Sequence, residues 1–381
     1  MSDHSQSRLI VARAVRVLVV NAGSSSLKLT LLDADDRVIC ARELEADGQD
    51  GYESALHDAL GHGLAEADAI GHRIVHGGDR FVTATLIDGR VEAALRELAD
   101  LAPLHQAKSL AAYDAVSAQL PDLPAIACFD TAFHVSLSAA ASTYALPAAW
   151  RERWPIRRYG FHGLSHSWVA RQAPRMLDRA PADLRIVSCH LGAGASLCAI
   201  ANGCSVDTTM GFTPLEGLVM ATRSGSVDPG LLLWLVEHTG MSTSDLGAAL
   251  EHDSGLKGLA GSEDMRVVLA RAGDGDAAST LGLDVWLHRL RALIAGMAAS
   301  MGGLDALVFT GGVGERSAPI RARALDGMGF LGLAVDRERN ETARGDLEIT
   351  AVGAGTRTLI IEAREDLEIA RQARAVMVPF S

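Results

Sequence analysis

The sequence predicts an α/β protein built from two copies of one domain. Residues 17–32 run from an apolar strand through an Asn-Ala-Gly-Ser-Ser-Ser loop directly into a second strand. Residues 186–209 repeat this plan, and residues 306–315 hold another apolar strand that leads into glycines. Loops of this kind present backbone N–H groups that can bind phosphate. We therefore expect a duplicated domain that holds a polyphosphate from two sides.

Each loop taken alone has a plainer alternative, an ordinary hairpin turn. Gly23 permits tight backbone geometry, the serines after it carry hydroxyl donors, and Lys28 adds a positive charge. Short glycine-rich matches are nevertheless often turns without a ligand. The second copy adds weight, because small residues fill 192–196 and Asn202-Gly203 then predicts a tight hairpin.

The first half of the chain predicts a meander of strands followed by alternating helices and strands. We expect strands at 17–20, 27–32, 38–41 and 69–75, and helices at about 52–65 and 91–101. A further strand within 121–130 ends on Asp130, where open α/β sheets carry functional groups.

The second half begins near a segment rich in Arg, Trp, Tyr and Gly at 150–165. A long helix is predicted over 278–301, because apolar side chains recur there at helical spacing. They are Trp286, Leu290, Leu293, Ile294, Met297 and Met301. This stripe predicts core packing, with a dimer face as the alternative. A strand at 358–363 and a helix at 364–376 close the chain.

We expect the first domain to comprise residues 15–148 and 366–381, the latter as a closing helix, and the second domain to comprise residues 149–365. Residues 1–14 form an N-terminal extension ahead of them.

Composition narrows the class of protein. At 381 residues and 48% hydrophobic content, the chain can fill two domains with a core. The net charge of −12 argues against nucleic acid as a partner, since such binding usually needs a basic patch. No apolar run approaches the roughly 20 residues that span a bilayer, and arginines interrupt the N-terminal apolar runs, so neither a membrane segment nor a signal peptide is expected. Five cysteines without C-x-x-C spacing predict reduced core thiols and a cytoplasmic protein.

Arginine recurs beside glycine in three segments, 71–78, 157–166 and 221–229, and the first two also contain histidines. Each arginine alone is more simply explained as a surface ion pair, but their joint occurrence with glycine loops favours an anion site. No histidine pair has the H-E-x-x-H spacing of zinc sites. Asp130 at a strand end and Glu365 at a helix start can hold a hard divalent cation, with helix capping as the alternative for Glu365.

These segments together resemble the acetokinase family, within the superfamily of actin, sugar kinases and heat-shock ATPases. The match extends from about residue 16 to 375 through NAGSSSLKL, GHRIVHGG, APLH, FDTAFH, RRYGFHGLSH, HLGAGAS, SVDTTMGFTPLEGL, TRSGSVDP and FTGGVGE. The resemblance implies two duplicated actin-like domains of ribonuclease H-like βββαβα ancestry, a central nucleotide cleft and a homodimer. It also implies transfer of a phosphoryl group between ATP and a small carboxylate such as acetate, with Mg²⁺ or alternatively Mn²⁺ as the metal.

The resemblance also assigns roles to matching positions. The catalytic set is Arg73, Asp130, His162 and Arg223. The metal ligands are Asn21, Asp130 and Glu365. Phosphate contacts are assigned to Asn21, Ser26, Lys28, His190, Gly192, Gly194, Gly311, Gly312 and Gly314. The adenosine segment is Asp264, Met265 and Arg266. The carboxylate pocket is formed by Arg73, Val75, Leu104, Phe161 and Pro214.

The chemistry of such a transfer needs no general base, because a carboxyl group with a pKa near ~4 is already ionised at neutral pH. It needs suppressed repulsion between two anions and in-line placement of the reacting atoms. We therefore expect direct attack of the carboxylate on the γ-phosphorus, without an obligatory phosphoenzyme.

Several positions depart from the usual family pattern. Ala193 and Arg316 replace asparagines, Ser226 replaces an aspartate, and the PLHQAK segment lacks the usual Asn-Pro. Arg316 places a cation at the nucleotide end, which leaves ATP, another nucleotide and pyrophosphate open as donors. A propionate or butyrate kinase of the same family is the nearest alternative. An actin-like or heat-shock-like ATPase that drives partner binding is the more distant one.

Overall fold

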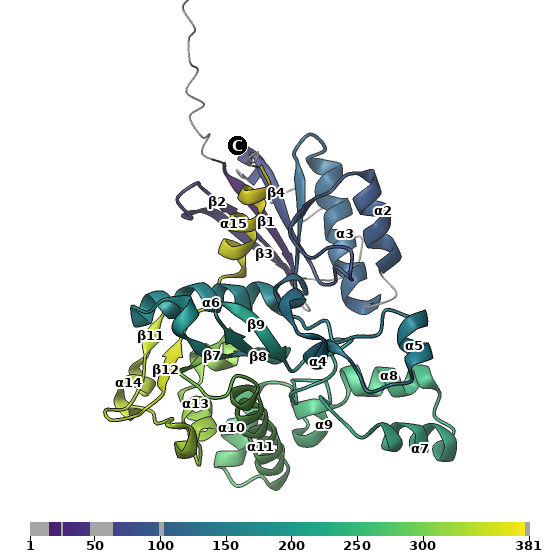
Figure 1. Cartoon of the computed structure of the whole chain (residues 1–381). Coiled ribbons are helices and arrows are strands. Elements are labelled where there is room, and N and C mark those ends of the chain that lie inside the picture. Colours follow the sequence, from purple (N-terminus) through teal and green to yellow (C-terminus); the bar gives the residue numbers. More distant parts are fainter. Residues whose placement is uncertain (1–14, 24–25, 46–63, 99–102, 378–381) are drawn as a thin grey trace, which may run out of the picture. The chain divides into compact units, whose positions relative to one another are not determined.

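The computed structural model describes residues 15–23, 26–45, 64–98 and 103–377 (Figure 1). The chain divides into two compact units, the first comprising Met1–Ile74, Thr83–Cys128 and Asp366–Ser381, the second Val75–Val82 and Phe129–Glu365. The second unit thus begins before the change at residue 149 that the sequence predicts. The extension 1–14 and most of the predicted helix 52–65 lie outside the described residues.

The first unit is built on a six-stranded sheet with the order β3-β2-β1-β4-β6-β5. β1 pairs antiparallel with β2, with Val17 opposite Leu32, and parallel with β4, with Val17 opposite Ala69. The strands are β1 Val17–Ala22, β2 Ser26–Leu32, β3 Val38–Glu45, β4 Ala69–Ile74, β5 Thr85–Leu86 and β6 Ala125–Phe129. The predicted meander is therefore present, with longer strands than expected.

The second unit carries a six-stranded sheet of matching plan, with the order β11-β12-β10-β7-β8-β9. Its antiparallel meander is β7 Arg185–Leu191, β8 Ala195–Ala201 and β9 Cys204–Thr208. β7 then pairs parallel with β10, as β1 does with β4. The remaining strands are β10 Ala306–Thr310, β11 Leu347–Glu348 and β12 Arg357–Ile360. This repeated order confirms the predicted duplication.

Three α-helices belong to the described part of the first unit. They are α2 Gly89–Glu97, α3 Pro103–Gln119 and α15 Glu365–Met377, with a 3-10 turn at Leu64–Glu66. α15 packs closely on β4, because a Cβ atom built at Gly71 would lie 2.6 Å from Ile369. The Arg374 guanidinium then donates to the carbonyl oxygens of Val15 and Asp33, at 3.1 and 2.6 Å. These bonds attach the end of the chain to the first unit.

The second unit holds the other helices. They are α4 Ala139–Ser142, α5 Ala148–Arg153, α6 Gly163–Leu177, α7 Pro229–Thr239, α8 Thr243–His252, α9 Gly255–Ala260, α10 Met265–Gly273, α11 Ala277–Ser300, α12 Gly311–Arg316, α13 Ala318–Leu325 and α14 Arg337–Thr342. Short 3-10 turns lie at Ala132–Ser136, Pro181–Asp183 and Gly329–Leu331.

The predicted apolar stripe lies on α11, which packs on α10 and on the sheet (Figure 1). Trp286, Leu290, Ile294 and Met297 are buried in the main core of the unit. The core-packing interpretation of this stripe is therefore confirmed. Among the described residues, no helix is both long and apolar enough to cross a membrane.

Candidate active site

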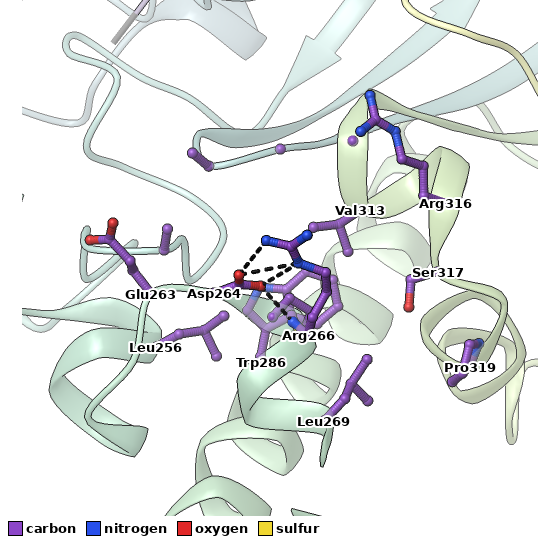
Figure 2. A pocket seen from close by; sticks show the side chains of 15 residues that line it. Leu256, Glu263, Asp264, Arg266, Leu269, Trp286, Val313, Arg316, Ser317 and Pro319 are labelled. Carbon is purple, nitrogen blue, oxygen red and sulfur yellow. Dashed lines mark hydrogen bonds and ion pairs between the residues drawn. The ribbon is translucent and has the colours of Figure 1, made fainter. Parts of the chain in front are cut away.

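The second unit contains a pocket of about 600 Å³ where several of the predicted nucleotide residues meet (Figure 2). Gly192 and Ala193 contribute from the turn between β7 and β8, and Gly312 and Arg316 from α12. The start of α10, together with α11, supplies Asp264, Met265, Arg266, Leu269 and Trp286. The other lining residues are Ala221, Leu256, Glu263, Val313, Ser317 and Pro319. Three segments that lie far apart in the sequence thus form one concave surface.

Asp264 shapes one wall of this pocket. It is the N-cap of α10, where its carboxylate accepts a hydrogen bond from the Arg266 backbone N–H at 2.8 Å. The Arg266 guanidinium also donates to it at 2.6 Å, as drawn in Figure 2. These hydrogen bonds lower the pKa of Asp264. The predicted adenosine segment is therefore an ordered helix start on the pocket wall.

The third glycine segment is held against the end of β7. Gly311 has a φ of +75°, and a Cβ atom there would lie 3.0 Å from the Leu191 backbone. Its N–H donates to the Glu315 carboxylate at 2.8 Å, as does the Ala363 N–H. This segment, which the sequence predicts to be a loop, forms the first turn of α12, because Glu315 accepts hydrogen bonds from donors that a loop would leave open.

The predicted anion-stabilising groups of the second unit meet beside the second glycine loop. A Cβ atom built at Gly194 would lie 3.3 Å from His162 Nε2 and 3.5 Å from the Arg223 guanidinium. The His162 and His190 rings lie 4.4 Å apart. A glycine here lets an anionic ligand approach the backbone, since any side chain would fill the space between the two donors.

Arg223 is fixed in place by two partners. Its Nε forms an ion pair with Glu251 at 2.8 Å, and both side chains are only 12–13% exposed. Its Nη1 donates to the Pro214 carbonyl oxygen at 3.1 Å. These contacts orient the planar guanidinium toward the Gly194 loop, which suits the binding of carboxylate or phosphate oxygens.

Asp130 and His162 are joined through the start of α6. Asp130 directly follows β6, as the sequence predicts, and it is 1% exposed. Its carbonyl oxygen accepts a hydrogen bond from the Gly163 N–H at 2.8 Å. No side chain would fit at Gly163, where a Cβ atom would lie 2.2 Å from that oxygen. His162, with a φ of 56°, then turns the chain into the helix.

Three of the apolar groups assigned to the carboxylate pocket, Val75, Phe161 and Pro214, lie in the second unit, whereas Leu104 belongs to the first. Val75 and Phe161 are 7% and 1% exposed and belong to one core cluster. Pro214 is also buried. The side chain of Leu104 lies outside the described part of the structure. Val75, Phe161 and Pro214 are thus buried in the unit that carries His162.

The predicted residues of the first unit form a separate set of contacts. Arg73 donates to the Asn21 side-chain oxygen at 3.1 Å, so these two candidates do meet. Ser26 donates to Glu43 at 2.7 Å, and Lys28 lies 3.7 Å from the same carboxylate. The hydrogen bond from Ser26, followed by the charge of Lys28, lowers the pKa of Glu43. Lys28 is thus engaged in an exposed ion pair.

The assigned metal ligands have the chemistry that magnesium prefers, since carboxylate and amide oxygens are hard ligands. Asn21 belongs to the first unit, and Asp130 and Glu365 belong to the second. Glu365 is the first residue of α15, as the capping alternative also requires. Among the described residues, no group of three or more His, Cys, Asp or Glu side chains is placed to hold a metal.

Several residues that build this site received no role in the sequence-based predictions. Glu251 and Glu315 hold Arg223 and Gly311, and Ser188, Ser196 and His166 lie directly behind His162. The two serines lie among mainly apolar residues of the strands β7 and β8. Buried serines in such strands need partners, and that was the available signal.

A duplicated α/β fold with phosphate-type glycine turns and fixed cations defines a class, the phosphotransferases of the actin-like superfamily. The family model described as the acetokinase family matches residues 46–371. The chain belongs to the acetokinase family.

Relatives of named activity agree with this membership. An acetate kinase from Gloeobacter violaceus is 48% identical over 310 residues, covering 81% of this chain and 76% of that protein. An acetate kinase from Shouchella clausii is 40% identical over 386 residues, with 93% and 98% covered. The crystal structure of Porphyromonas gingivalis acetate kinase matches with a TM-score of 0.86 at 34% identity, covering 96% of this chain and 100% of that one. A propionate kinase from Francisella tularensis matches with a TM-score of 0.88 at 32% identity, with 95% and 100% covered. The predicted pair of actin-like domains agrees with these structures.

Proposed function

We propose that this enzyme transfers the γ-phosphoryl group of ATP reversibly to the carboxylate of acetate, forming acetyl phosphate. The observation that carries the proposal is the arrangement of His162 and Arg223 at Gly194, next to a pocket that contains Gly192 and the start of α10. Donors for an anion adjoin a cavity large enough for part of a nucleotide. The acetate kinases among the relatives support this choice of substrate.

The pocket binds the nucleoside, with Asp264 and Trp286 in its walls. Gly192, Gly194 and Gly312 allow the phosphates to come close to the backbone. His162 and Arg223 stabilise the charge that develops on the transferred group, because fixed donors act strongly where water is excluded. The carboxylate oxygen forms a bond to the γ-phosphorus while the bond to the β-phosphate oxygen breaks, so ADP leaves with that electron pair.

Arg73 and Asn21 of the first unit are proposed to act on the same transferred group. Their mutual hydrogen bond at 3.1 Å gives the Arg73 guanidinium a fixed direction. Asn21, Asp130 and Glu365 would hold Mg²⁺, with Mn²⁺ as an alternative, and the metal would neutralise charge on the phosphates.

The test is a hydroxamate assay with purified full-length protein. Acetate, ATP, Mg²⁺ and hydroxylamine should give acetohydroxamate, because hydroxylamine traps acetyl phosphate. Replacing ATP with pyrophosphate tests the donor alternative that Arg316 leaves open. Slow ATP hydrolysis that does not respond to carboxylates would instead support a partner-driving ATPase. Inversion at a chiral γ-phosphorus would support direct transfer, and retention would exclude it.

A second candidate function is phosphorylation of propionate. The Francisella tularensis propionate kinase, with a TM-score of 0.88, supports it. One methylene in an apolar pocket changes specificity by only ~10- to 200-fold, so both acids can react at different rates. The ratio of kcat/KM for acetate, propionate and butyrate distinguishes the two candidates.

We also propose a homodimer in the cytoplasm. The five cysteines of the chain are all free, and Cys128, Cys189 and Cys198 are buried. Free thiols support a reducing compartment. Exposed apolar side chains on α7 support a second copy as the partner of that helix.

A further inference from the structure

A continuous row of hydrogen bonds begins at His162 and joins helix α6 to strands β8 and β7 of the second unit. His162 Nδ1 lies 2.9 Å from Ser196 Oγ, and that oxygen lies 2.8 Å from His166 Nε2. His166 Nδ1 then lies 2.9 Å from Ser188 Oγ. Ser196 is on β8, Ser188 on β7 and His166 on α6, so three elements fix the geometry of the row.

The residues of the row beyond His162 are inaccessible to water. His166, Ser188 and Ser196 are each 0% exposed. Burial, and then the neighbouring His134 and His190, lower the pKa of His166 well below its ordinary value. His166 is therefore a neutral imidazole with a single N–H, and each serine has a single O–H.

These protons determine the direction of the row. If Ser188 donates to His166, His166 can donate to Ser196, and Ser196 can donate to Nδ1 of His162. Every buried proton then has an acceptor. Three hydrogen bonds are made by three donors.

Every other direction leaves a buried hydroxyl without an acceptor. In the reverse direction the O–H of Ser188 is left over, and if both histidines donate to Ser196, its own O–H is left over. Within the described part of the chain, neither serine hydroxyl has a further hydrogen-bond partner. A buried donor without an acceptor is costly, so the first direction is the stable one.

We propose that Ser188, His166 and Ser196 form a directional hydrogen-bond relay that holds His162 as the tautomer protonated on Nε2. These three are positioning residues, because they act on the reacting group only through His162. His162 Nε2 is the atom that a Cβ at Gly194 would approach to 3.3 Å, so the fixed N–H points at the glycine loop. The relay thus supplies a neutral donor, never an acceptor, to an anionic ligand. The inference deepens the proposed function and rests on it for the identity of that anion.

His190 repeats the arrangement on a smaller scale. Its Nδ1 lies 2.9 Å from Oγ of Ser165, which is 0% exposed. The opposite nitrogen, Nε2, lies 3.6 Å from a Cβ atom built at Gly192. A serine thus stands behind each of the two histidines that border this loop.

The first test reads the tautomer directly in the resting enzyme. Full-length protein labelled with ¹⁵N-histidine is examined by two-bond ring correlations at about pH 8, above the ordinary histidine pKa of about 6.5. Loss of one set of signals in His162→Gln assigns the ring. We expect the proton on Nε2 in the wild type and a mixture of tautomers in Ser196→Ala.

Ser205→Ala is the matched control. Ser205 is equally buried and bonds to another histidine, His134, at 2.8 Å, but it does not join the relay. The His162 signals should be unchanged in this variant. A wild-type proton on Nδ1, or an unchanged tautomer in Ser196→Ala, overturns the proposal. If Ser196→Ala does not fold, Ser188→Ala probes the inner end of the relay and should shift the same ring.

The second test is kinetic. Loss of one such hydrogen bond should lower kcat by roughly five- to tenfold in Ser196→Ala, while KM for acetate changes little. In a His162→Ala background the same substitution should add less than about a twofold change, because a positioning residue has nothing left to position. A full additional loss in that background would show a merely structural role. If the wild type forms no acyl phosphate, the proposed function fails, whereas the tautomer test still decides the relay.

Discussion

At the scale of single residues, Arg223 is the group whose removal should matter most. It is a nearly buried cation, held by Glu251 and the Pro214 carbonyl, and it borders the Gly194 loop. An arginine that stabilises charge in phosphoryl transfer contributes ~10³-fold or more to the rate. Arg223→Ala should therefore lower kcat in the hydroxamate assay by about that factor.

Arg223→Lys should recover little of this loss, because a lysine lacks the fixed planar fork. The control is Arg96→Ala, which removes an exposed arginine paired with Glu92 and Asp114. That variant should keep wild-type turnover. Activity of Arg223→Ala within an order of magnitude of the wild type would remove Arg223 from the mechanism.

The position of Arg316 leads to a prediction about how the phosphoryl donor is bound. It lies on α12 at the nucleotide pocket, apart from the Arg266–Asp264 pair (Figure 2). A charge-assisted hydrogen bond to a phosphate contributes about 1.5–3 kcal/mol, so Arg316→Asn should raise KM for ATP by on the order of tenfold. The rise should be smaller at high salt, which screens exposed charges.

Steady-state kinetics at two ionic strengths measure this effect. The control is Arg323→Asn, which changes an arginine of α13 that pairs with Asp284 of α11. An unchanged KM for ATP together with an altered KM for pyrophosphate would instead assign Arg316 to the alternative donor.

The residues of the sequence motifs could be predicted better than the residues that hold their side chains in place. Arg73 with Asn21, and His162 with Arg223, meet as the sequence suggests, because each pair is placed by strand ends and glycine turns that have local signals. Glu251 has no such signal. It lies 28 residues beyond Arg223, at the end of α8, and only the tertiary structure brings the two together.

At the scale of elements, α7 stands out because none of its residues is buried and several of its large apolar side chains are exposed. Leu231, Leu233 and Trp234 are 47%, 64% and 52% exposed, an apolar face of the kind that marks interaction sites. If a second copy covers this face, Leu233→Glu places an unpaired charge in the interface and should weaken association by on the order of 100-fold or more.

Light scattering after size exclusion should then give the mass of one 40.1 kDa chain for Leu233→Glu and twice that mass for the wild type. Val352→Glu, a change at a fully exposed position, should leave the dimer intact. A dimer that is unaffected by Leu233→Glu would place the interface elsewhere.

Local signals explain which elements could be predicted. Asn202 and Gly203 both have positive φ, 54° and 75°, as the hairpin motif requires. α6 was missed because its start carries no capping side chain: His162 enters it in a left-handed conformation, and Pro174 lies inside it. Its position depends instead on the Gly163 hydrogen bond to Asp130, a contact that sequence pattern does not reveal.

At the scale of the whole molecule, duplication was predictable because each copy repeats one local plan, whereas the unit boundaries were not. Residues 75–82 belong to the second unit although they directly follow β4. Gly77 explains this, because its N–H donates to Thr131 at 3.1 Å and a Cβ atom there would lie 3.1 Å from Phe129. Such a contact joins segments more than fifty residues apart.

Buried histidines in both units should make the whole protein sensitive to acid. His72, His76 and His134 are at most 1% exposed. Burial lowers their pKa values to about 3, 4 and 4. The unfolded chain, with ordinary histidine pKa values of about 6.5, therefore binds more protons than the folded protein at lower pH. The stability associated with the neutral rings is complete above pH ~6.5 and is lost as the pH falls toward the folded pKa values.

His72 offers the sharpest test of this linkage. Neither of its ring nitrogens has a hydrogen-bond partner within the described residues, and the ring packs edge-on against Tyr113 at 5.3 Å. At pH 5 the neutral ring costs about 2 kcal/mol relative to pH 7, so His72→Phe should remove about that much of the pH dependence while keeping a ring against Tyr113. Urea unfolding midpoints at the two pH values measure the difference. His238→Gln, at an exposed position on α7, should leave the dependence as it is in the wild type. If His72→Phe and the wild type lose the same free energy of unfolding on acidification, protonation of the His72 ring does not cause the loss.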